Sequence, residues 1–143
     1  MTRLPPNPAL IQLEVLVGEW DVEVPEIPGA RGKATITWIE GGAFLRFHTE
    51  APDPAPDATL IIGRDDSTDE YTLFHYDSRG VSRVYGMGFD NGRWRMWRDA
   101  QGFHQRFEGT VAPDGTTIRG AWEKSPDGAE WQRDLTLVYT KRP

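Results

Sequence analysis

The alternation of hydrophobic and polar residues along the chain predicts a protein built almost entirely of β-strands. From Gly18 onward apolar residues recur at every second position, as in the run of Trp20, Val22 and Val24 between acidic neighbours. This period of two is typical of strands with one dry face and one face in water. After this first strand, the predicted strands cover residues 33–40, 43–50, 58–64, 70–77, 81–89, 93–99, 103–111, 116–123 and 131–141.

Only the segment ahead of these strands has a helical spacing of apolar residues. Asn7 can cap the free backbone N–H groups at a helix start, and Pro8 fits the first helical position because its missing N–H costs nothing there. Gly18 is typical of the residue that follows a helix. We therefore expect one short helix over about 9–17, with its apolar stripe against the end of the sheet.

Short turns separate nearly all the predicted strands, and no connection has the length of a crossover helix. The pair Asn91-Gly92 is the strongest hairpin signal. Short connections make neighbouring strands antiparallel, and closure of the sheet would remove its two exposed edges. We therefore predict an all-β single domain over 1–143, a ten-stranded antiparallel up-and-down barrel with a short N-terminal helix. A two-sheet sandwich is the alternative.

Composition and charge narrow the classes of function. The chain of 143 residues has a net charge of −6, which disfavours nucleic acid as a partner. It has no cysteine, which removes disulfides, thiolate metal sites and cysteine nucleophiles. We find no run of about 18 apolar residues, and the N-terminus lacks the basic start of a signal peptide. We therefore expect no membrane segment and a cytoplasmic location.

Side chains suited to a small-molecule site occur at alternate positions of several predicted strands. A lining that is mostly apolar, with a few converging polar groups, is typical of ligand pockets. Arginines can hold a carboxylate or phosphate through two hydrogen bonds. If the faces that carry them point inward, these side chains form a polar cluster among aromatic rings. The candidate ligand-binding residues are Arg46, His48, His75, Arg83, Tyr85, Trp94, Met96, Arg98, Trp122 and Arg133.

The pattern decides the inward face for some of these strands and leaves it open for one. In the strands at 81–89 and 93–99, the face that carries arginine also carries the large apolar residues, which favours an inward position. In the strand at 43–50, one face holds Arg46 and His48 and the other holds Leu45 and Phe47. Either face of this strand could point inward.

Two histidines on non-adjacent predicted strands, His48 and His75, are candidate acid/base catalysts. Histidine changes protonation near neutral pH, and an arginine could stabilise a developing oxyanion. The chain has three histidines, and no two of them lie at the short spacing of zinc ligands. We therefore predict no metal and no cofactor.

Several motifs carry a resemblance to a known family. They are GEW at 18–20, GGAFL at 41–45, YDSRGVSRVY at 76–85, WRMWRD at 94–99, FHQRFEGT at 103–110 and WEKSPDG at 122–128. With them, nearly the whole chain resembles a family of uncharacterised bacterial lipocalin-like (calycin) barrel proteins, related in fold to nitrobindins and fatty-acid-binding proteins. The resemblance implies a ten-stranded barrel, and the family has no settled activity to transfer.

The two better-known relatives of that family suggest specific features to look for. Nitrobindin-like proteins hold haem through a histidine near the C-terminus, and the last predicted strand here has none. Fatty-acid-binding proteins hold a carboxylate with an Arg-x-Tyr pair. Arg133 and Tyr139 are six positions apart, so they match that pair only loosely.

Three functions remain open from the sequence. The first is a small-molecule binding protein that holds an apolar or aromatic ligand, neutral or anionic, inside the barrel. The second is an enzyme of the same fold, an isomerase, cyclase or dehydratase. The third is a barrel filled by its own aromatic side chains that acts in protein interactions. Trp97, expected to point outward between arginines, would stack on them or mark a homodimer contact.

Overall fold

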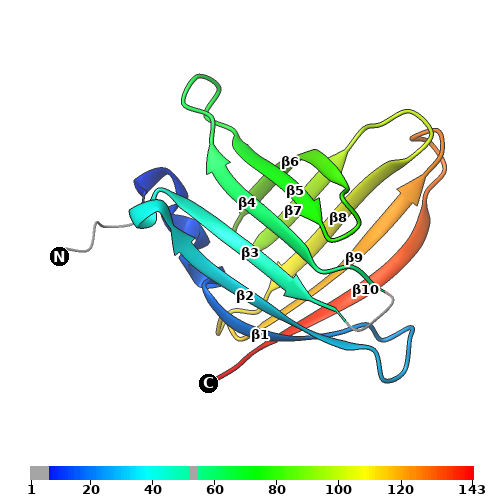
Figure 1. Cartoon of the computed structure of the whole chain (residues 1–143), viewed down its shortest axis with the longest axis horizontal. Helices are drawn as coiled ribbons and strands as arrows, with labels where there is room; N and C mark the ends of the chain where they lie inside the picture. The colour runs from blue at the N-terminus through cyan, green and yellow to red at the C-terminus, as the bar shows by residue number, and fades with distance from the viewer. Residues whose placement is uncertain (1–6, 52–54) are drawn as a thin grey trace.

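The protein, in a computed structural model that describes residues 7–51 and 55–143, is a closed antiparallel barrel (Figure 1). Each strand pairs with its neighbours in the sequence, and β1 pairs with β10 to complete the ring. The strands are β1 (Gly18–Glu23), β2 (Arg31–Ile39), β3 (Phe44–Glu50), β4 (Ala58–Arg64), β5 (Tyr71–Asp77), β6 (Ser82–Asp90), β7 (Arg93–Arg98), β8 (His104–Val111), β9 (Thr117–Ser125) and β10 (Gln132–Lys141). The predicted up-and-down barrel is confirmed, and the sandwich alternative is wrong.

The pleat of each strand sends alternate side chains into the barrel. On β7, Trp94 and Met96 are buried, while Arg93, Arg95 and Trp97 between and beside them are exposed. The same alternation runs along β6, where the buried residues are Tyr85, Met87 and Phe89. The inward faces predicted for these two strands are confirmed.

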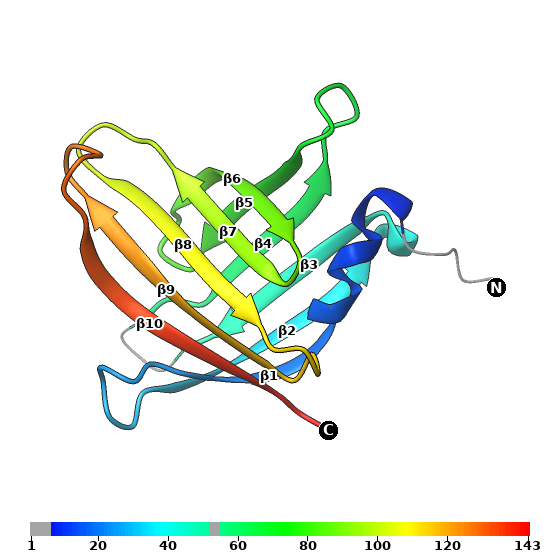
Figure 2. The same cartoon turned by 180° about the vertical axis from the view of Figure 1, so that it is seen from behind.

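The N-terminal helix, η1 (Pro8–Leu16), covers one end of the barrel, as both views show (Figures 1 and 2). It is a 3₁₀-helix, and its apolar residues Leu10, Leu13 and Leu16 follow the three-residue turn of that helix, so they lie in one row. All three side chains are fully buried. The Asn7 side chain accepts a hydrogen bond of 3.0 Å from the backbone N–H of Ala9, as the capping prediction required.

Polar contacts fasten this helix to the strands beneath it. The Gln12 side chain donates to the hydroxyl of Tyr71 on β5 and, at 3.1 Å, to the carbonyl of Phe89 on β6. The Lys141 ammonium at the end of β10 donates to the carbonyl of Val15 at 3.3 Å. The helix therefore closes this end of the barrel, which we call the closed end; the other is the open end.

The turns divide between these two ends. The short helix η2 (Glu40–Gly42) and the turns after β4, β6 and β8 lie at the closed end. The connections after β1, β3, β5, β7 and β9 lie at the open end. Within the described residues, no helix has the length and apolar character needed to cross a bilayer.

A glycine on β6 makes room for a tryptophan on the outer surface of the sheet. A Cβ at Gly86 on β6 would collide with the indole of Trp97, which lies across it from β7. The guanidinium of Arg95 lies 6.0 Å from the Trp97 ring. Trp97 therefore points outward and stacks near arginine, as expected from the sequence.

The packing of η1 generates a test of stability. Leu13→Ala should lower the free energy of unfolding by about 2–5 kcal/mol, because it leaves a cavity beneath the helix. Ile11→Ala on the same helix is the matched control. Ile11 is 52% exposed, so its loss should change stability by less than about 0.5 kcal/mol. Urea unfolding of both variants measures the difference, and equal effects would contradict the closed-end packing.

Candidate functional site

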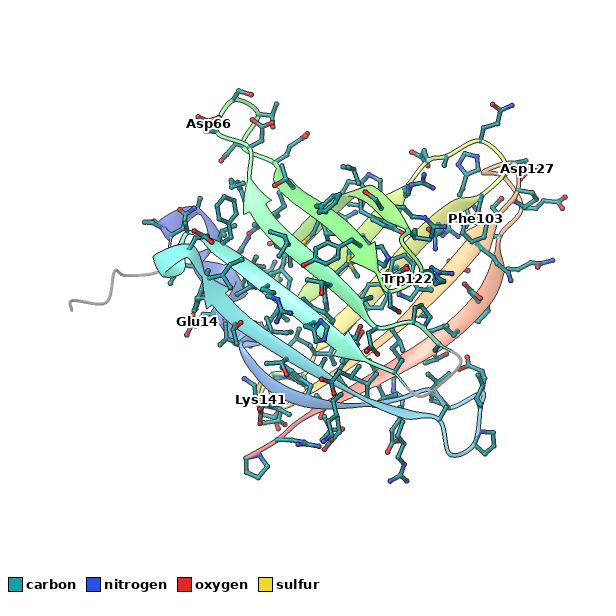
Figure 3. All side chains as sticks on the ribbon, in the orientation of Figure 1. Glu14, Asp66, Phe103, Trp122, Asp127 and Lys141 are labelled. Atoms are coloured by element: carbon teal, nitrogen blue, oxygen red, sulfur yellow. The ribbon has the colours of Figure 1, made fainter. Side chains whose placement is uncertain are left out.

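The barrel encloses a cavity of about 470 Å³ toward its open end. Figure 3 shows Trp122, a wall residue, on the ring of strands, with Asp66 and Asp127 on turns at the two ends. The lumen is therefore not filled by side chains, contrary to the filled-barrel alternative. The apolar wall consists of Val22, Phe47, Leu60, Trp94, Met96, Trp122, Leu135, Leu137 and Tyr139.

A row of small inward residues explains why the open end is hollow. Gly32 on β2, Thr49 on β3 and Ala58 on β4 line the cavity, and Thr49 lies opposite Ala58. One layer deeper, the corresponding row is Ile36, Phe47 and Leu60, and its larger side chains fill more of the lumen.

Aromatic rings form the floor of the cavity. The Trp94 ring centroid lies 5.6 Å from that of Phe47 and 5.4 Å from that of Phe107. Phe47 also meets Tyr139 edge to face at 6.0 Å. Such tilted and edge-to-face pairs are the favoured arrangements of aromatic side chains. They separate the hollow part of the lumen from the packed closed end.

His75 brings a polar group to this apolar wall, and the residues behind it fix its orientation. Its Nε2 lies 3.0 Å from Oδ2 of Asp77, and the Asp77 side chain is fully buried. Arg79 in the following turn holds the same carboxylate, with Nη2 at 2.7 Å from Oδ2 and Nε at 3.2 Å from Oδ1.

The charge state of Asp77 follows from these contacts. The hydrogen bonds from Arg79 hold the pKa of the Asp77 carboxyl well below its usual range; burial opposes this effect, and the bond to His75 adds to it. An ionised carboxylate only accepts hydrogen bonds. His75 therefore donates from Nε2, and in the neutral imidazole the lone pair is on Nδ1.

A second polar group lies beside His75. The Tyr85 hydroxyl donates to Oε1 of Gln105 at 2.7 Å, and Arg83 Nη1 donates to the same oxygen at 3.3 Å. The Tyr85 ring centroid lies 5.9 Å from that of His75 and 5.8 Å from that of Trp122. The Tyr85 hydroxyl proton is thus already engaged by a side chain of the protein.

Two further wall residues carry polar atoms. The Nε1–H of Trp94 is buried and has no hydrogen-bond partner among the described residues. Burial raises the pKa of the Tyr139 hydroxyl far above its usual value, so it stays a neutral phenol. The Trp94 Nε1 atom has no surface open to the cavity, so of these two residues the cavity meets chiefly apolar ring atoms.

The structure separates the predicted site residues into groups. His75, Trp94, Met96 and Trp122 line the cavity. Tyr85 is buried in the interior next to them. Arg83 and Arg98 are half-buried near the open end, on the inward face of β6 and β7, and neither belongs to the cavity wall.

Arg46 and His48 do not enter the cavity, which corrects the expectation for them. Phe47 and Thr49 line it, so the residues that alternate with them on β3 point outward. His48 Nδ1 lies 2.9 Å from Oγ1 of Thr59 on the outer face of β4. The aromatic and aliphatic packing of Leu45 and Phe47 decides the face of this strand.

Arg133 also lies outside the cavity. The pairing of β10 with β9 shifts register between Arg133 and Leu135. This irregularity reverses the alternation, so Arg133 leaves the face that Leu135 and Tyr139 share. Its Nη1 instead donates to Oγ1 of Thr136 at 3.1 Å, on the exposed surface.

Sequence reasoning missed the parts played by Gln105, Asp77 and Arg79. Gln105 lies two residues before the buried Phe107 on β8, so the two share the inward face, and this spacing could have identified it. The link from Arg79 back to Asp77 depends on the turn after β5, which the strand pattern does not describe. Among the described residues, no cluster of three or more histidine, aspartate or glutamate side chains could hold a metal ion.

Comparisons with known proteins support the fold and name no activity. No family model and no curated protein matches the chain. Among solved structures, the crystal structure of Rv2717c from M. tuberculosis matches with a TM-score of 0.67, covering 97% of this chain and 100% of that chain. The two sequences are 15% identical, so the likeness shows the barrel fold alone.

The buried Asp77 carboxylate predicts a pH-dependent effect on stability. Its pKa is lower in the folded protein than its ordinary 3.8, so its ionisation stabilises the fold fully above about pH 4. That contribution is lost as the pH falls from there toward the folded pKa. The stability gap between the wild type and Asp77→Asn should therefore be large at pH 7 and shrink toward pH 2, as measured by urea unfolding at each pH.

Asp66→Asn, in the exposed turn after β4, is the control for this measurement. Its effect on the free energy of unfolding should be small at every pH. A gap for Asp77→Asn that stays constant from pH 7 to pH 2 would contradict the ionised, hydrogen-bonded state of Asp77.

Proposed function

We propose that the protein is a small-molecule binding protein of the lipocalin-like type, which holds an apolar or aromatic ligand inside the barrel. The observation that carries this proposal is the cavity of about 470 Å³ with its aromatic and aliphatic wall. Ligand pockets commonly measure about 300–1,000 Å³ and combine such walls with a few polar groups. A cytoplasmic location belongs to the same proposal and agrees with a chain that lacks cysteine.

The wall sets the expected strength of binding. Burying roughly 250–300 Å² of an aromatic ligand stabilises the complex by about 6–8 kcal/mol before the costs of association. After those costs, we expect dissociation constants from the micromolar to the sub-millimolar range for a simple probe. A natural ligand that also satisfies the polar groups would bind more tightly.

The open end supplies the route of entry. The connection between β1 and β2 carries Val24 and Ile27, and both contribute to the cavity lining. Ile27 is 57% exposed, so apolar side chains reach the mouth, where Arg31, Lys33 and Glu50 also contribute to the lining. Ala51 and Ala55 flank the mouth on the side of β3 and β4. An apolar ligand would enter past the apolar side of this rim. Arg83 and Arg98 near this end would suit a ligand with an anionic group.

An enzyme of the same fold is the second candidate, and the His75–Asp77 pair favours it. A histidine whose tautomer is fixed by a carboxylate is a common form of general base. Arg83 lies opposite His75 in the pairing of β5 with β6 and could stabilise an oxyanion. The reaction would be an isomerisation, cyclisation or dehydration. His48 has no part in this candidate because it points outward.

Filling the cavity tests the binding proposal. Leu60→Trp should weaken binding of the neutral fluorescent probe N-phenyl-1-naphthylamine at least ten-fold, about 1.4 kcal/mol, because the indole would occupy the ligand space. Val84→Trp is the control, since Val84 is 72% exposed on the outer face, and it should leave the affinity unchanged. Fluorescence titration gives the affinities, and thermal melting shows that both variants are folded. Equal affinity of the folded Leu60→Trp variant and the wild type, or no binding by the wild type, would refute the proposal.

A further inference from the structure

His75 on the cavity wall has a fixed orientation, because its ring is hydrogen-bonded to Asp77, which Arg79 holds in turn. Asp77 Oδ1 accepts from the Arg79 backbone N–H at 2.9 Å and from Arg79 Nε at 3.2 Å. Asp77 Oδ2 accepts from Arg79 Nη2 at 2.7 Å and from His75 Nε2 at 3.0 Å. Both oxygens of the buried carboxylate are therefore used, and all of these partners donate.

This arrangement determines what His75 offers to the cavity. Its Nε2–H is directed to Asp77, so neutral His75 has an unprotonated Nδ1. Nδ1 makes no hydrogen bond with any described residue, and it is not among the buried polar atoms that lack a partner. The side chain is 17% exposed and lines the cavity. In its neutral form, His75 thus presents a hydrogen-bond acceptor to the lumen.

From this geometry we infer that the cavity selects apolar ligands that carry a neutral hydroxyl group, a phenol or an alcohol, whose O–H donates to Nδ1 of His75. The inference rests on the proposed binding function and names the ligand class for that site. In an apolar lumen an acceptor left without a donor is costly, and a matching donor removes that cost. The nearby Tyr85 hydroxyl does not supply that donor, because it already donates its hydrogen bond to Gln105.

The charges around His75 disfavour a carboxylate in the same position. The lone pair on Nδ1 would repel a carboxylate oxygen, and the ionised Asp77 lies directly behind the ring. The positive charge of Arg79 is already paired with Asp77. A carboxylate could accept a hydrogen bond from Nδ1 only where that nitrogen carries a proton.

A matched set of probes tests the inference by isothermal titration calorimetry on the full chain. The probes are 2-naphthol, its methyl ether 2-methoxynaphthalene, and 2-naphthoate. The ether is the more apolar molecule, so burial alone would favour it. We expect 2-naphthol to bind about ten-fold more tightly than the ether to the wild type. In His75→Leu this preference should disappear while both neutral probes still bind.

The possible results separate the inference from the proposed function. If both neutral probes bind and the ether binds as tightly as 2-naphthol, the hydroxyl selection is refuted and the binding function stands. If 2-naphthoate binds most tightly, the site is an anion site and the inference is wrong. If none of the three binds, the proposed function itself fails.

Nitrogen-15 NMR of the wild type gives a second test, which does not depend on the folding of any variant. In the neutral ring of His75 the proton should be on Nε2, and adding 2-naphthol should shift the Nδ1 resonance in the direction of hydrogen-bond acceptance. A proton on Nδ1 in the free protein would overturn the inference. Asp77→Asn, whose amide can donate or accept, should reduce the preference for 2-naphthol several-fold, and Asp66→Asn should not.

Discussion

The pairing of β1 with β10 is the interaction on which the rest of the structure depends. In that pairing Trp20 lies opposite Lys141 and Val22 lies opposite Tyr139, so the first and last strands close the sheet into a ring. Closure satisfies the backbone groups that an open sheet would expose at its edges. It also creates an inside and an outside, so every second side chain is committed to an enclosed space. A site in the lumen exists only because of this closure.

What fills the enclosed space differs between the two ends, and this difference produces the site. At the closed end, the leucines of η1 and the indole of Trp20 are fully buried. At the open end, Thr49 and Ala58 lie opposite each other on the cavity wall, and their side chains are too small to reach across the lumen. The cavity is thus a consequence of side-chain size at a few inward positions. His75 and the polar residues that orient it add a hydrogen-bonding group to the apolar wall.

The sequence was sufficient to predict the strands, the turns and the closure, because these follow from local alternation and turn residues. It also placed Trp94 and Met96 inward, since both lie on one face of β7 and only Trp97, among the apolar residues of this strand, lies on the other. It could not decide β3, because both faces of that strand carry a phenylalanine, Phe44 on one and Phe47 on the other. The position of Arg133 depended on a register shift between two strands, which no pattern within one strand reveals.

The His75–Asp77–Arg79 arrangement was beyond reach for a related reason. His75 and Asp77 are two apart on one face of β5, which the sequence shows, but Arg79 reaches Asp77 only because the turn folds back. The orientation of the histidine, and with it the chemistry of the cavity, therefore depends on tertiary contacts. Strand alternation predicts where a side chain points, while its protonation state depends on what lies behind it.

The central claim is that closure leaves an apolar space inside the barrel, and a crystal structure under xenon pressure tests it most directly. Xenon occupies dry apolar cavities in proteins. The account predicts xenon density in the lumen beside Phe47, Leu60 and Leu137. A lumen filled by side chains, with no xenon bound there, would contradict it.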